Sequence, residues 1–214
     1  MRRTGLRRFA GLRARAARPQ PLARGARNAL RYIRGMSAHG RHAGNGIAAF
    51  DERQLRDALA QFATGVTIVC ARAPDHRYVG FTANSFNSVS LAPPLVLWSL
   101  SHRSGSLATF VAAERYAVNV LSTGQIDLAR RFSRPHADRF ENVPFRLGWS
   151  DAPLIDRCVA WFECRHYAQH RAGDHWLFIG EIVTVERARG RGLVFQHGRF
   201  GATTPLERGD DGKV

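Results

Sequence analysis

The sequence predicts a mainly β protein, an antiparallel barrel with a few short helices. Three observations lead to this fold class. Six or more segments are rich in β-branched and aromatic residues, as strands are. The helices predicted between them are short. No strand–helix unit repeats along the chain, as a doubly wound parallel sheet would require.

The first predicted elements are a helix and a hairpin. Apolar residues recur at helical spacing over residues 50–62, and Asp51 stands where an N-cap is expected. The pattern changes to β-branched residues over 64–70, which predicts a strand. A turn at 73–77 then leads into a second arm over 78–82.

The remaining elements follow from the same patterns. Two long strands, 158–167 and 176–185, flank a hairpin connection at 169–174. Short segments at 193–195 and 199–202 are expected to complete the sheet. The other predicted elements are strands over 95–100 and 115–121, a short helix through Val111 capped by Ser104 or Ser106, a helix over 125–132 and a loop over 133–157.

A segment of small polar residues, 80–95, is the most informative part of the chain. Hydroxyl and amide side chains alternate there with apolar ones, and an apolar strand follows two prolines. Such polar groups are costly to bury unless something hydrogen-bonds them. A flat heteroaromatic cofactor with a phosphate tail would do so. The polar members are Thr82, Asn84, Ser85, Asn87, Ser88 and Ser90.

The net charge of +15 belongs to the N-terminal head and not to the rest of the chain. Residues 1–50 carry twelve Arg and no Asp or Glu, whereas residues 51–214 carry twenty Lys and Arg against seventeen Asp and Glu, a net charge of +3. The head has few large apolar residues, so it cannot bury enough surface to offset its ordering entropy. We therefore expect residues 1–46 to be a disordered or targeting-like extension.

Three interpretations of the head remain open. It is a solvated tail, translated upstream of a working start at Met36; or an Arg-rich, acid-free transit peptide; or an arm that binds nucleic acid or another anionic surface. A secretory signal is not expected, because no continuous apolar core region is present. No run has the length of a membrane span, and we expect a cytoplasmic protein.

Other classes of site have little support. Cys70, Cys158 and Cys164 lack metal-ligand spacing and are expected to be small buried residues in a reducing compartment, with no metal bound. There is no G-x-G-x-x-G dinucleotide loop, no H-E-x-x-H motif and no G-x-S-x-G elbow.

Three motifs in order carry a resemblance to a known family. They are Thr64-Gly-Val-Thr-Ile-Val69, the segment 82–91, and Gly173-Asp-His-Trp-Leu-Phe-Ile-Gly180. Together they resemble the flavin reductase family, the reductase components of two-component flavin-dependent monooxygenases, from about residue 50 to residue 201. The resemblance implies an FMN-binding split β-barrel of Greek-key type, usually a homodimer, that uses NADH or NADPH to reduce FMN or FAD.

The resemblance also implies a flavin site. In the family the segment 82–86 lies along the isoalloxazine, 88–89 continues toward the ribityl chain, and 103–106 forms a phosphate loop at a helix start. Taken alone, 82–90 is also compatible with an edge strand, and Ser104 and Ser106 with a simple helix cap. The implied contacts are Thr82, Ala83, Asn84, Ser85, Phe86, Ser88, Val89, Arg103, Ser104, Gly105 and Ser106.

The nicotinamide site is implied in the same way. His175 is expected to stand near the nicotinamide on the open flavin face, where it positions the ring; alone it would be an ordinary turn residue. Phe132 and His136 bound a loop that closes over the cofactors in relatives, and Arg134 there could meet a phosphate or remain a solvated charge. Phe200 stands where Tyr is common in the family. The implied nucleotide contacts further along are Gln196, His197, Gly198 and Arg199.

These observations predict an NAD(P)H-dependent flavin reductase in residues 47–204, followed by a flexible tail at 205–214. It is expected to form a homodimer and to supply reduced flavin to a separate oxygenase. The alternatives are a split-barrel flavin- or haem-binding protein or oxidase without reductase activity, and a nucleic-acid-binding protein that depends on the Arg-rich head.

Overall fold

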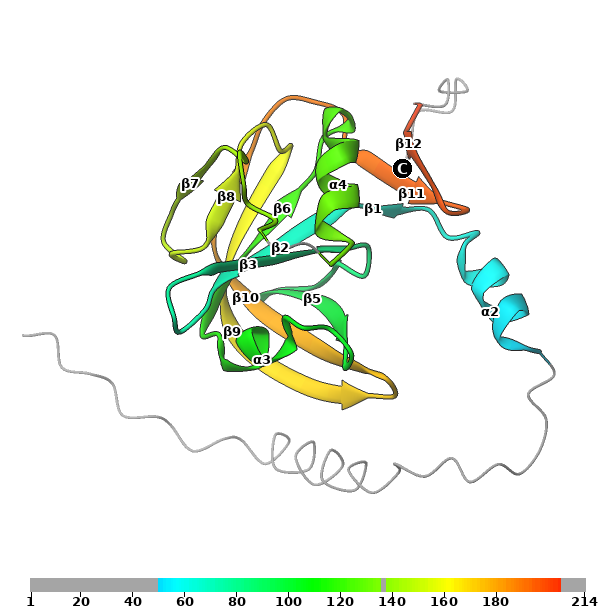
Figure 1. The fold of residues 1–214 in the computed structure, drawn as a ribbon, viewed down its shortest axis with the longest axis horizontal. Coiled ribbons are helices and arrows are strands. Elements are labelled where there is room, and N and C mark those ends of the chain that lie inside the picture. Colours follow the sequence, from blue (N-terminus) through cyan, green and yellow to red (C-terminus); the bar gives the residue numbers. More distant parts are fainter. Residues whose placement is uncertain (1–49, 136–137, 205–214) are drawn as a thin grey trace, which may run out of the picture. The chain divides into compact units, whose positions relative to one another are not determined.

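The computed structural model describes residues 50–135 and 138–204, which form a mainly antiparallel β protein (Figure 1). This confirms the predicted fold class. The predictions for the head, for His136 and for the tail at 205–214 lie outside the described residues. In chain order the elements are α2 (Glu52–Leu59), β1 (Thr64–Gly65), β2 (Thr67–Arg72), β3 (Tyr78–Ala83), β4 (Asn87–Leu91), β5 (Pro94–Ser101), α3 (Leu107–Ala112), β6 (Arg115–Val120), the 3₁₀ turn η1 (Thr123–Gln125), α4 (Ile126–Phe132), β7 (Phe145–Leu147), β8 (Pro153–Ile155), β9 (Ala160–Ala172), β10 (His175–Arg187), β11 (Leu193–Gln196) and β12 (Arg199–Ala202).

The main sheet has seven strands in the order β3-β2-β6-β9-β10-β5-β4, and every neighbouring pair is antiparallel. Its two edge strands, β3 and β4, follow each other in the sequence. Only residues 84–86 join them. A link of three residues spans at most about 14 Å between the flanking Cα atoms, so the sheet must curl until its edges approach. We call residues 84–86 the edge link.

Strand β2 of the curled sheet is buried on both faces, which explains its continuous apolar run. Ile68 and Cys70 pack into one core with Phe132 of α4, whereas Val69 and Ala71 pack into the other. The second core lies inside the curl and centres on the fully buried Trp98, which stacks on Phe178 with ring centroids 4.2 Å apart. A strand with two buried faces has no polar face to show.

The sequence analysis expected the last two strands to complete the main sheet, and this prediction is wrong. β11 and β12 instead form a separate three-stranded sheet with β1, in the order β1-β11-β12. Val66 connects the two sheets, because its N–H donates to Leu193 O and its carbonyl accepts from Leu121 N. Short strands carry no signal of which sheet they join, so the sequence could not decide this.

Three local predictions also need correction. The β9–β10 connection is only Gly173 and Asp174, and residues 169–172 belong to β9; Gly173 has φ +57°, which glycine adopts without strain. The predicted loop at 133–157 contains the β7–β8 hairpin. Ser106 precedes α3 without a side-chain cap, and Ser104 Oγ instead accepts from Ser106 N. Asp51, in contrast, caps α2 as predicted.

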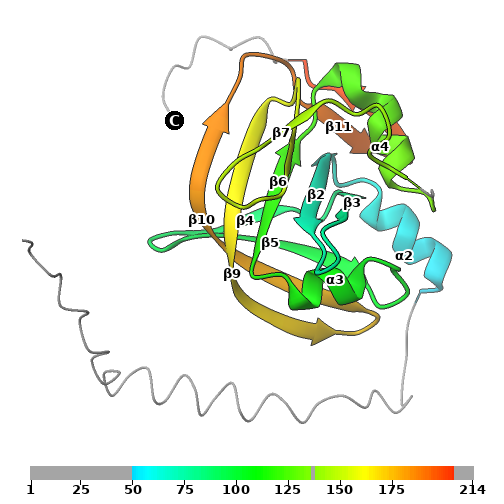
Figure 2. The same ribbon diagram turned by 60° about the vertical axis from the view of Figure 1, so that its left-hand side comes forward.

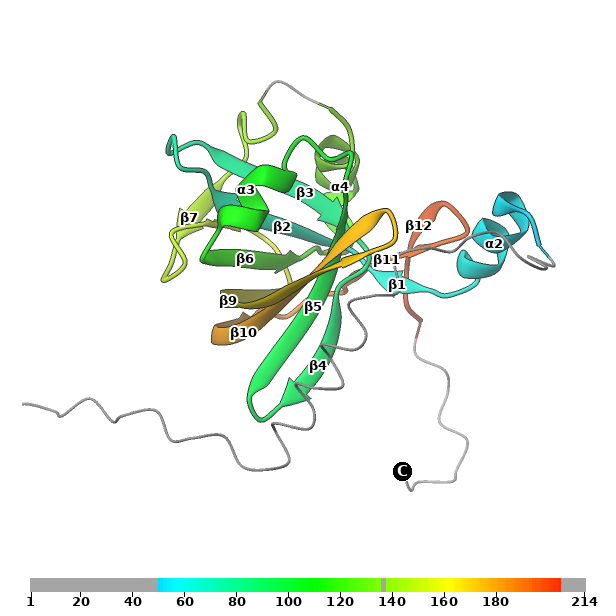
Figure 3. The same cartoon turned by 90° about the horizontal axis from the view of Figure 1, so that it is seen from below.

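Two elements extend from the main sheet. The β4–β5 hairpin projects outward (Figures 2 and 3), and Leu91 at its tip is 94% exposed. Helix α2 lies beside β11 and β12, and has no buried residue. It is held there by bonds from His197 N to Ala60 O and from Gln196 Nε2 to Gln61 O. Within the described residues, no helix has the length and apolar character needed to cross a membrane.

Candidate functional site

The edge link carries the polar residues that the sequence singled out. Ser85 attaches it to the rim of the curled sheet, because its Oγ accepts from Ser99 N at 2.9 Å and lies 3.3 Å from Ser99 O. A serine side chain thus replaces the missing strand partner of β5 beyond the end of β4. Asn84 and Phe86 on either side belong to no strand. Their backbone groups are therefore not used in a strand ladder and can meet a ligand.

A pocket of about 690 Å³ lies against the edge link; we call it the link pocket. Thr64 and Gly65 of β1 form part of its wall. Thr64 Oγ1 is buried and, among the described residues, lacks a hydrogen-bond partner. A side chain at Gly65 would meet no atom within 4 Å, so the backbone there is open to the pocket. The remaining lining comes from Arg56, Leu59, Ala60, Phe62, Ala63, Asn84, Ser85, Phe86, Asn87, Leu97, Phe195, Gln196 and His197.

A second pocket of about 630 Å³ adjoins it; we call it the arginine pocket. Asn84 and Phe195 line both pockets, so the two share a wall. Thr82 faces the second pocket, and its hydroxyl donates to Ala129 O of α4 at 2.7 Å. The other lining residues are Val66, Ile126, Ala129, Arg130, Ser133, Arg134, Gly198, Arg199 and Phe200.

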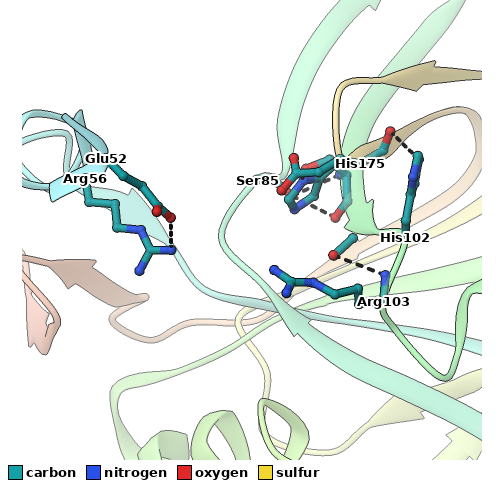
Figure 4. A network of polar contacts seen from close by, with 9 residues as sticks. Glu52, Arg56, Ser85, His102, Arg103 and His175 are labelled. Atoms are coloured by element: carbon teal, nitrogen blue, oxygen red, sulfur yellow. Dashed lines mark hydrogen bonds and ion pairs between the residues drawn. The ribbon is translucent and has the colours of Figure 1, made fainter. Parts of the chain in front are cut away.

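His175 begins β10 beside the edge link, and Figure 4 shows it close to Ser85, His102 and Arg103. Its Nδ1 lies 2.7 Å from Asp174 Oδ1. The pKa of Asp174 is lowered, first by this hydrogen bond and then by the charges of His175 and Arg103. Because the folded-state pKa is depressed, the carboxylate acceptor is present at neutral pH and is lost only as the pH falls through the lowered value. The contact occupies Nδ1 and leaves the other ring nitrogen of His175, Nε2, available to a ligand.

His102, the residue after β5, supports the turn formed by Asp174 and His175. Its backbone N–H donates to Asp174 O at 2.9 Å, and its Nε2 lies 3.1 Å from His175 O. The strand register pairs His175 with Ser101, two residues from the Ser99 that holds Ser85. The turn and the edge link therefore meet at one end of β5.

The structure brings some predicted residues together and leaves others apart. Asn84, Ser85, Phe86, Gln196 and His197 line the link pocket, and Thr82, Gly198 and Arg199 join Asn84 in the arginine pocket. Arg103, Ser104 and Gly105 lie in the loop after β5, next to the His102 that contacts the Asp174–His175 turn; neither they nor His175 line either pocket. Ser88 and Val89 are exposed on β4, whereas Ala83, Ser106 and Phe132 are buried.

Sequence reasoning did not assign several lining residues to the site. Phe62, Ala63, Thr64 and Gly65 line the link pocket; the segment from Thr64 onward was one of the three family motifs, which is the signal that could have placed it there. Arg56 lies on α2 and pairs with Glu52 at 2.5 Å (Figure 4). Arg130 had no sequence signal, because α4 follows the edge link by some forty residues and only the fold brings them together, whereas Ser133 belongs to the loop at 132–136 that the family resemblance had implied.

Comparison with known proteins identifies the family. The model of the flavin reductase like domain matches residues 59–204, and the chain belongs to this family. It is 44% identical over 151 residues to a probable flavin reductase of Rhizobium meliloti, a match that covers 71% of this chain and 49% of the relative. It is 41% identical to the FMN reductase (NADH) SmoA of Agrobacterium fabrum, over 71% of this chain and 86% of the relative.

A solved structure is similar throughout the same region. The NADH:FAD oxidoreductase SgcE6 of Streptomyces globisporus, in complex with NAD and FAD fragments, superposes with a TM-score of 0.71 at 38% identity, covering 77% of this chain and all of that chain. The chain spans about half the length of the Rhizobium meliloti relative.

The Ser85–Ser99 contact makes a testable prediction. Ser85→Ala removes both bonds between the edge link and β5, so the Ser99 amide loses its acceptor. One lost hydrogen bond weakens local closure by about 1.4 kcal/mol, or tenfold. We expect the Ser99 amide to exchange with solvent about tenfold faster, measured by hydrogen exchange with NMR detection. Ser88→Ala, on exposed β4, is the control and should leave that rate unchanged. An unchanged rate in Ser85→Ala would show that Ser85 does not hold the link.

Proposed function

We propose that this protein is an NAD(P)H-dependent flavin reductase that binds FMN or FAD in the link pocket. The observation that supports this most directly is the edge link itself, because its uncharged donors and acceptors border an open pocket and it meets the Asp174–His175 turn at one end of β5. The family relationship points the same way. Relatives include proteins named as FMN and FAD reductases that use NADH.

The link pocket fits a flavin. The ring of a flavin has donors and acceptors along one edge, and this pocket offers amide and hydroxyl groups from Asn84 and Ser85. The buried Thr64 Oγ1, unpartnered within the described residues, is explained if a ligand atom bonds it. The absence of carboxylates from the lining suits an anionic, phosphate-bearing molecule. We assign that phosphate to Arg103 and the backbone of Gly105, in the loop after β5.

His175 is the residue that we assign to the nicotinamide. When bound, the nicotinamide nucleotide supplies a hydride to the flavin, a transfer that requires reacting atoms about 3–3.5 Å apart. Asp174 fixes the His175 ring through Nδ1, and His102 holds the backbone of the same turn. Nε2 can then hydrogen-bond the carboxamide and orient it. His175 acts by position, and no proton transfer is required of it.

We further propose that the reduced flavin passes to a separate oxygenase in the cytoplasm. Two relatives are named as the reductase component of a trigonelline monooxygenase and as the reductase subunit HsaB of a flavin-dependent monooxygenase. A reductase of this kind must release its product, so we expect a dissociation constant near 1 μM, about −8 kcal/mol. Quenching of flavin fluorescence on titration with the protein measures it.

His175→Ala tests the assignment. Loss of one orienting hydrogen bond should raise KM for NADH about tenfold and slow flavin reduction, whereas the flavin dissociation constant should change less than twofold. Stopped-flow absorbance at the flavin band measures the KM and the reduction rate, and fluorescence quenching measures the flavin dissociation constant. Asp174→Asn should have a smaller effect in the same direction, because it weakens only the contact that fixes the ring.

His170→Ala is the matched control, because His170 is an exposed histidine on the neighbouring strand β9. If His175→Ala and His170→Ala behave alike, His175 is only a turn residue. If the wild-type protein binds flavin but does not oxidise NADH or NADPH, the reductase proposal is wrong and a non-reductase flavoprotein remains.

We also propose a homodimer in which a second copy covers α2 and the β4–β5 tip. Leu55 and Leu59 are exposed apolar residues on α2, and Phe62, just beyond its end, is 75% exposed. A helix of eight residues is not stable in water without packing, so these apolar residues need a partner. Leu91 adds an exposed leucine at the hairpin tip.

Leu91→Lys should therefore weaken the dimer at least tenfold, since a buried leucine contributes about 2 kcal/mol. Sedimentation velocity over a range of concentrations measures the dissociation constant. Ala188→Lys places the same charge on an exposed loop and should leave the dimer intact. A monomeric wild-type protein, or equal dimer strength in all three proteins, would rule out this interface.

For the Arg-rich head we propose a dispensable extension. A chain starting at Met36 should fold and reduce flavin at the rate of the full-length protein. Only the full-length chain should bind DNA at low salt and lose it as salt rises, because the binding depends on counterion release. A truncated protein that folds but cannot reduce flavin would mean that the head contributes to the site.

A further inference from the structure

A further pocket lies away from the edge link; we call it the far pocket. It has a volume of about 380 Å³ and is lined by the β2–β3 turn, the end of α3, the start of β6 and the loop before β8. Strand β2 runs from Thr67, which bonds Ala83 O beside the edge link, to Arg72 in the pocket lining, and five residue steps of a strand span about 16 Å. Figure 3 shows the β2–β3 turn and α3 at the end of the fold away from β1 and α2. The far pocket shares no lining residue with the link pocket or the arginine pocket, so it is a separate site.

One wall of the far pocket is a loop fixed to a buried carboxylate. Ser150 lines the pocket, and its backbone N–H and its hydroxyl donate to Glu163 Oε1 at 2.7 and 2.9 Å. Glu163 is 3% exposed and, within residues 50–135 and 138–204, forms no ion pair. A side-chain carbon at Gly148 would lie 2.6 Å from this carboxylate, so the loop packs directly on it. A buried carboxylate is costly unless it is hydrogen-bonded, so Glu163 keeps the loop in one place.

The loop in turn holds a guanidinium group at the pocket. The Arg115 guanidinium lies over the Trp149 ring, 4.8 Å from its centroid, and Arg115 Nη1 donates to Trp149 O at 3.4 Å. Arg115 lines the pocket and has no ion-pair partner in the described part of the chain. The other guanidinium in the lining, that of Arg72, is already paired with Asp151. Arg115 therefore has a fixed position and further N–H donors, which suit a carboxylate.

Glu114 supplies the opposite charge. It precedes Arg115 in the chain and also lines the pocket, and its backbone carbonyl accepts from His166 N at 2.8 Å. Its carboxylate forms no ion pair with any residue that the structure describes. Two solvated surface charges are the simpler explanation of Glu114 and Arg115. That explanation does not account for Trp149, because a solvated arginine needs no aromatic surface on an anchored loop to hold it.

The rest of the lining includes small apolar residues. Ala73, which is buried, lines the pocket together with Pro74, Ala112 and Ala113. Their short side chains leave room for an apolar group of similar size. A held guanidinium, an unpaired carboxylate and a small apolar surface match a carboxylate, an ammonium group and a short apolar side chain. An α-amino acid carries these three groups on one carbon atom.

We propose that the far pocket binds a small apolar α-amino acid. Arg115 donates to the carboxylate of the ligand, Glu114 accepts from its ammonium group, and its side chain lies against Ala73 and Ala112. The proposal goes beyond the proposed flavin reductase function and does not depend on it, because the far pocket shares no lining residue with the link pocket.

Titration of the full-length protein with L-valine, followed by NMR shifts of the backbone amides, tests the proposal without a measurement of activity. L-valine should produce saturable shifts in residues 112–115 and 148–152. The analogue 3-methylbutanoate lacks the ammonium group, and 2-methylpropylamine lacks the carboxylate. Each should bind at least tenfold more weakly than L-valine, because each leaves one charged group of the pocket without its hydrogen-bond partner.

Substitutions at the pocket test its parts separately. Glu114→Gln and Arg115→Gln should each weaken L-valine binding at least tenfold, and Arg115→Lys, which keeps the charge without the planar fork, should lie between. Ala112→Leu fills the pocket without a change in charge and should also weaken binding at least tenfold. Because Ala112 is exposed, this variant folds even where Arg115→Gln loosens the loop. Arg187→Gln, at the exposed end of β10, and Asp127→Asn, with a fully exposed side chain on α4, are the matched controls and should bind as wild type does. Circular dichroism checks that each variant folds.

The proposal is overturned if L-valine produces no saturable shifts, or if the shifts lie at the link pocket or the arginine pocket instead. It is also overturned if either analogue binds as well as L-valine, or if the variants of Glu114, Arg115 and Ala112 bind like the two controls. A wild-type protein that reduces flavin but does not bind L-valine contradicts this inference alone. Binding of L-valine that depends on Glu114 and Arg115, in a protein that does not reduce flavin, contradicts only the proposed function.

Discussion

The short edge link is the constraint on which the rest of the structure depends. Three residues, 84–86, must connect β3 and β4, which lie at opposite edges of a seven-stranded sheet. The sheet therefore curls, and the curl encloses the Trp98 core. Because the link belongs to no strand ladder, its polar groups must be satisfied in another way. Ser85 bonds Ser99, and the remaining groups border the link pocket. The same covalent restraint thus shapes the core and opens the site.

The two pockets differ in charge although they share a wall. The link pocket is bordered by apolar residues and by uncharged donors and acceptors, and the Arg56 in its lining is already paired to Glu52. The arginine pocket has three guanidinium groups and an aromatic wall. A ring with polar edges suits the first and a nucleotide phosphate suits the second. The two pockets differ in charge because different elements supply their polar groups. The edge link contributes uncharged groups to the link pocket, whereas α4 and β12 contribute arginines to the arginine pocket.

Local patterns predicted most elements but not their partners. Asp51 caps α2 and the β-branched run after residue 64 is strand, as the sequence analysis expected, and β10 begins at His175, one residue before its predicted start. The predicted six-residue connection at 169–174 was wrong, because β9 continues to Ala172 and its polar residues there pair with β10. The β7–β8 hairpin was missed because three-residue strands are too short to show a period. The placement of β11 and β12 was wrong because pairing is a long-range property.

The sequence by itself determined the fold class, the polar character of the edge link and the motifs of the flavin reductase family, since each is a local pattern of residue types. It also separated the basic head from a nearly neutral remainder. Only the tertiary structure decided that Thr64 and Asn84 share one pocket, that Ser85 serves as a strand partner of Ser99, and that Arg130 and Arg199 converge on one site. These contacts join segments far apart in the chain. The Ser85–Ser99 contact exists only because the short link brings the sheet edges together, and no local pattern of side chains encodes any of these long-range contacts.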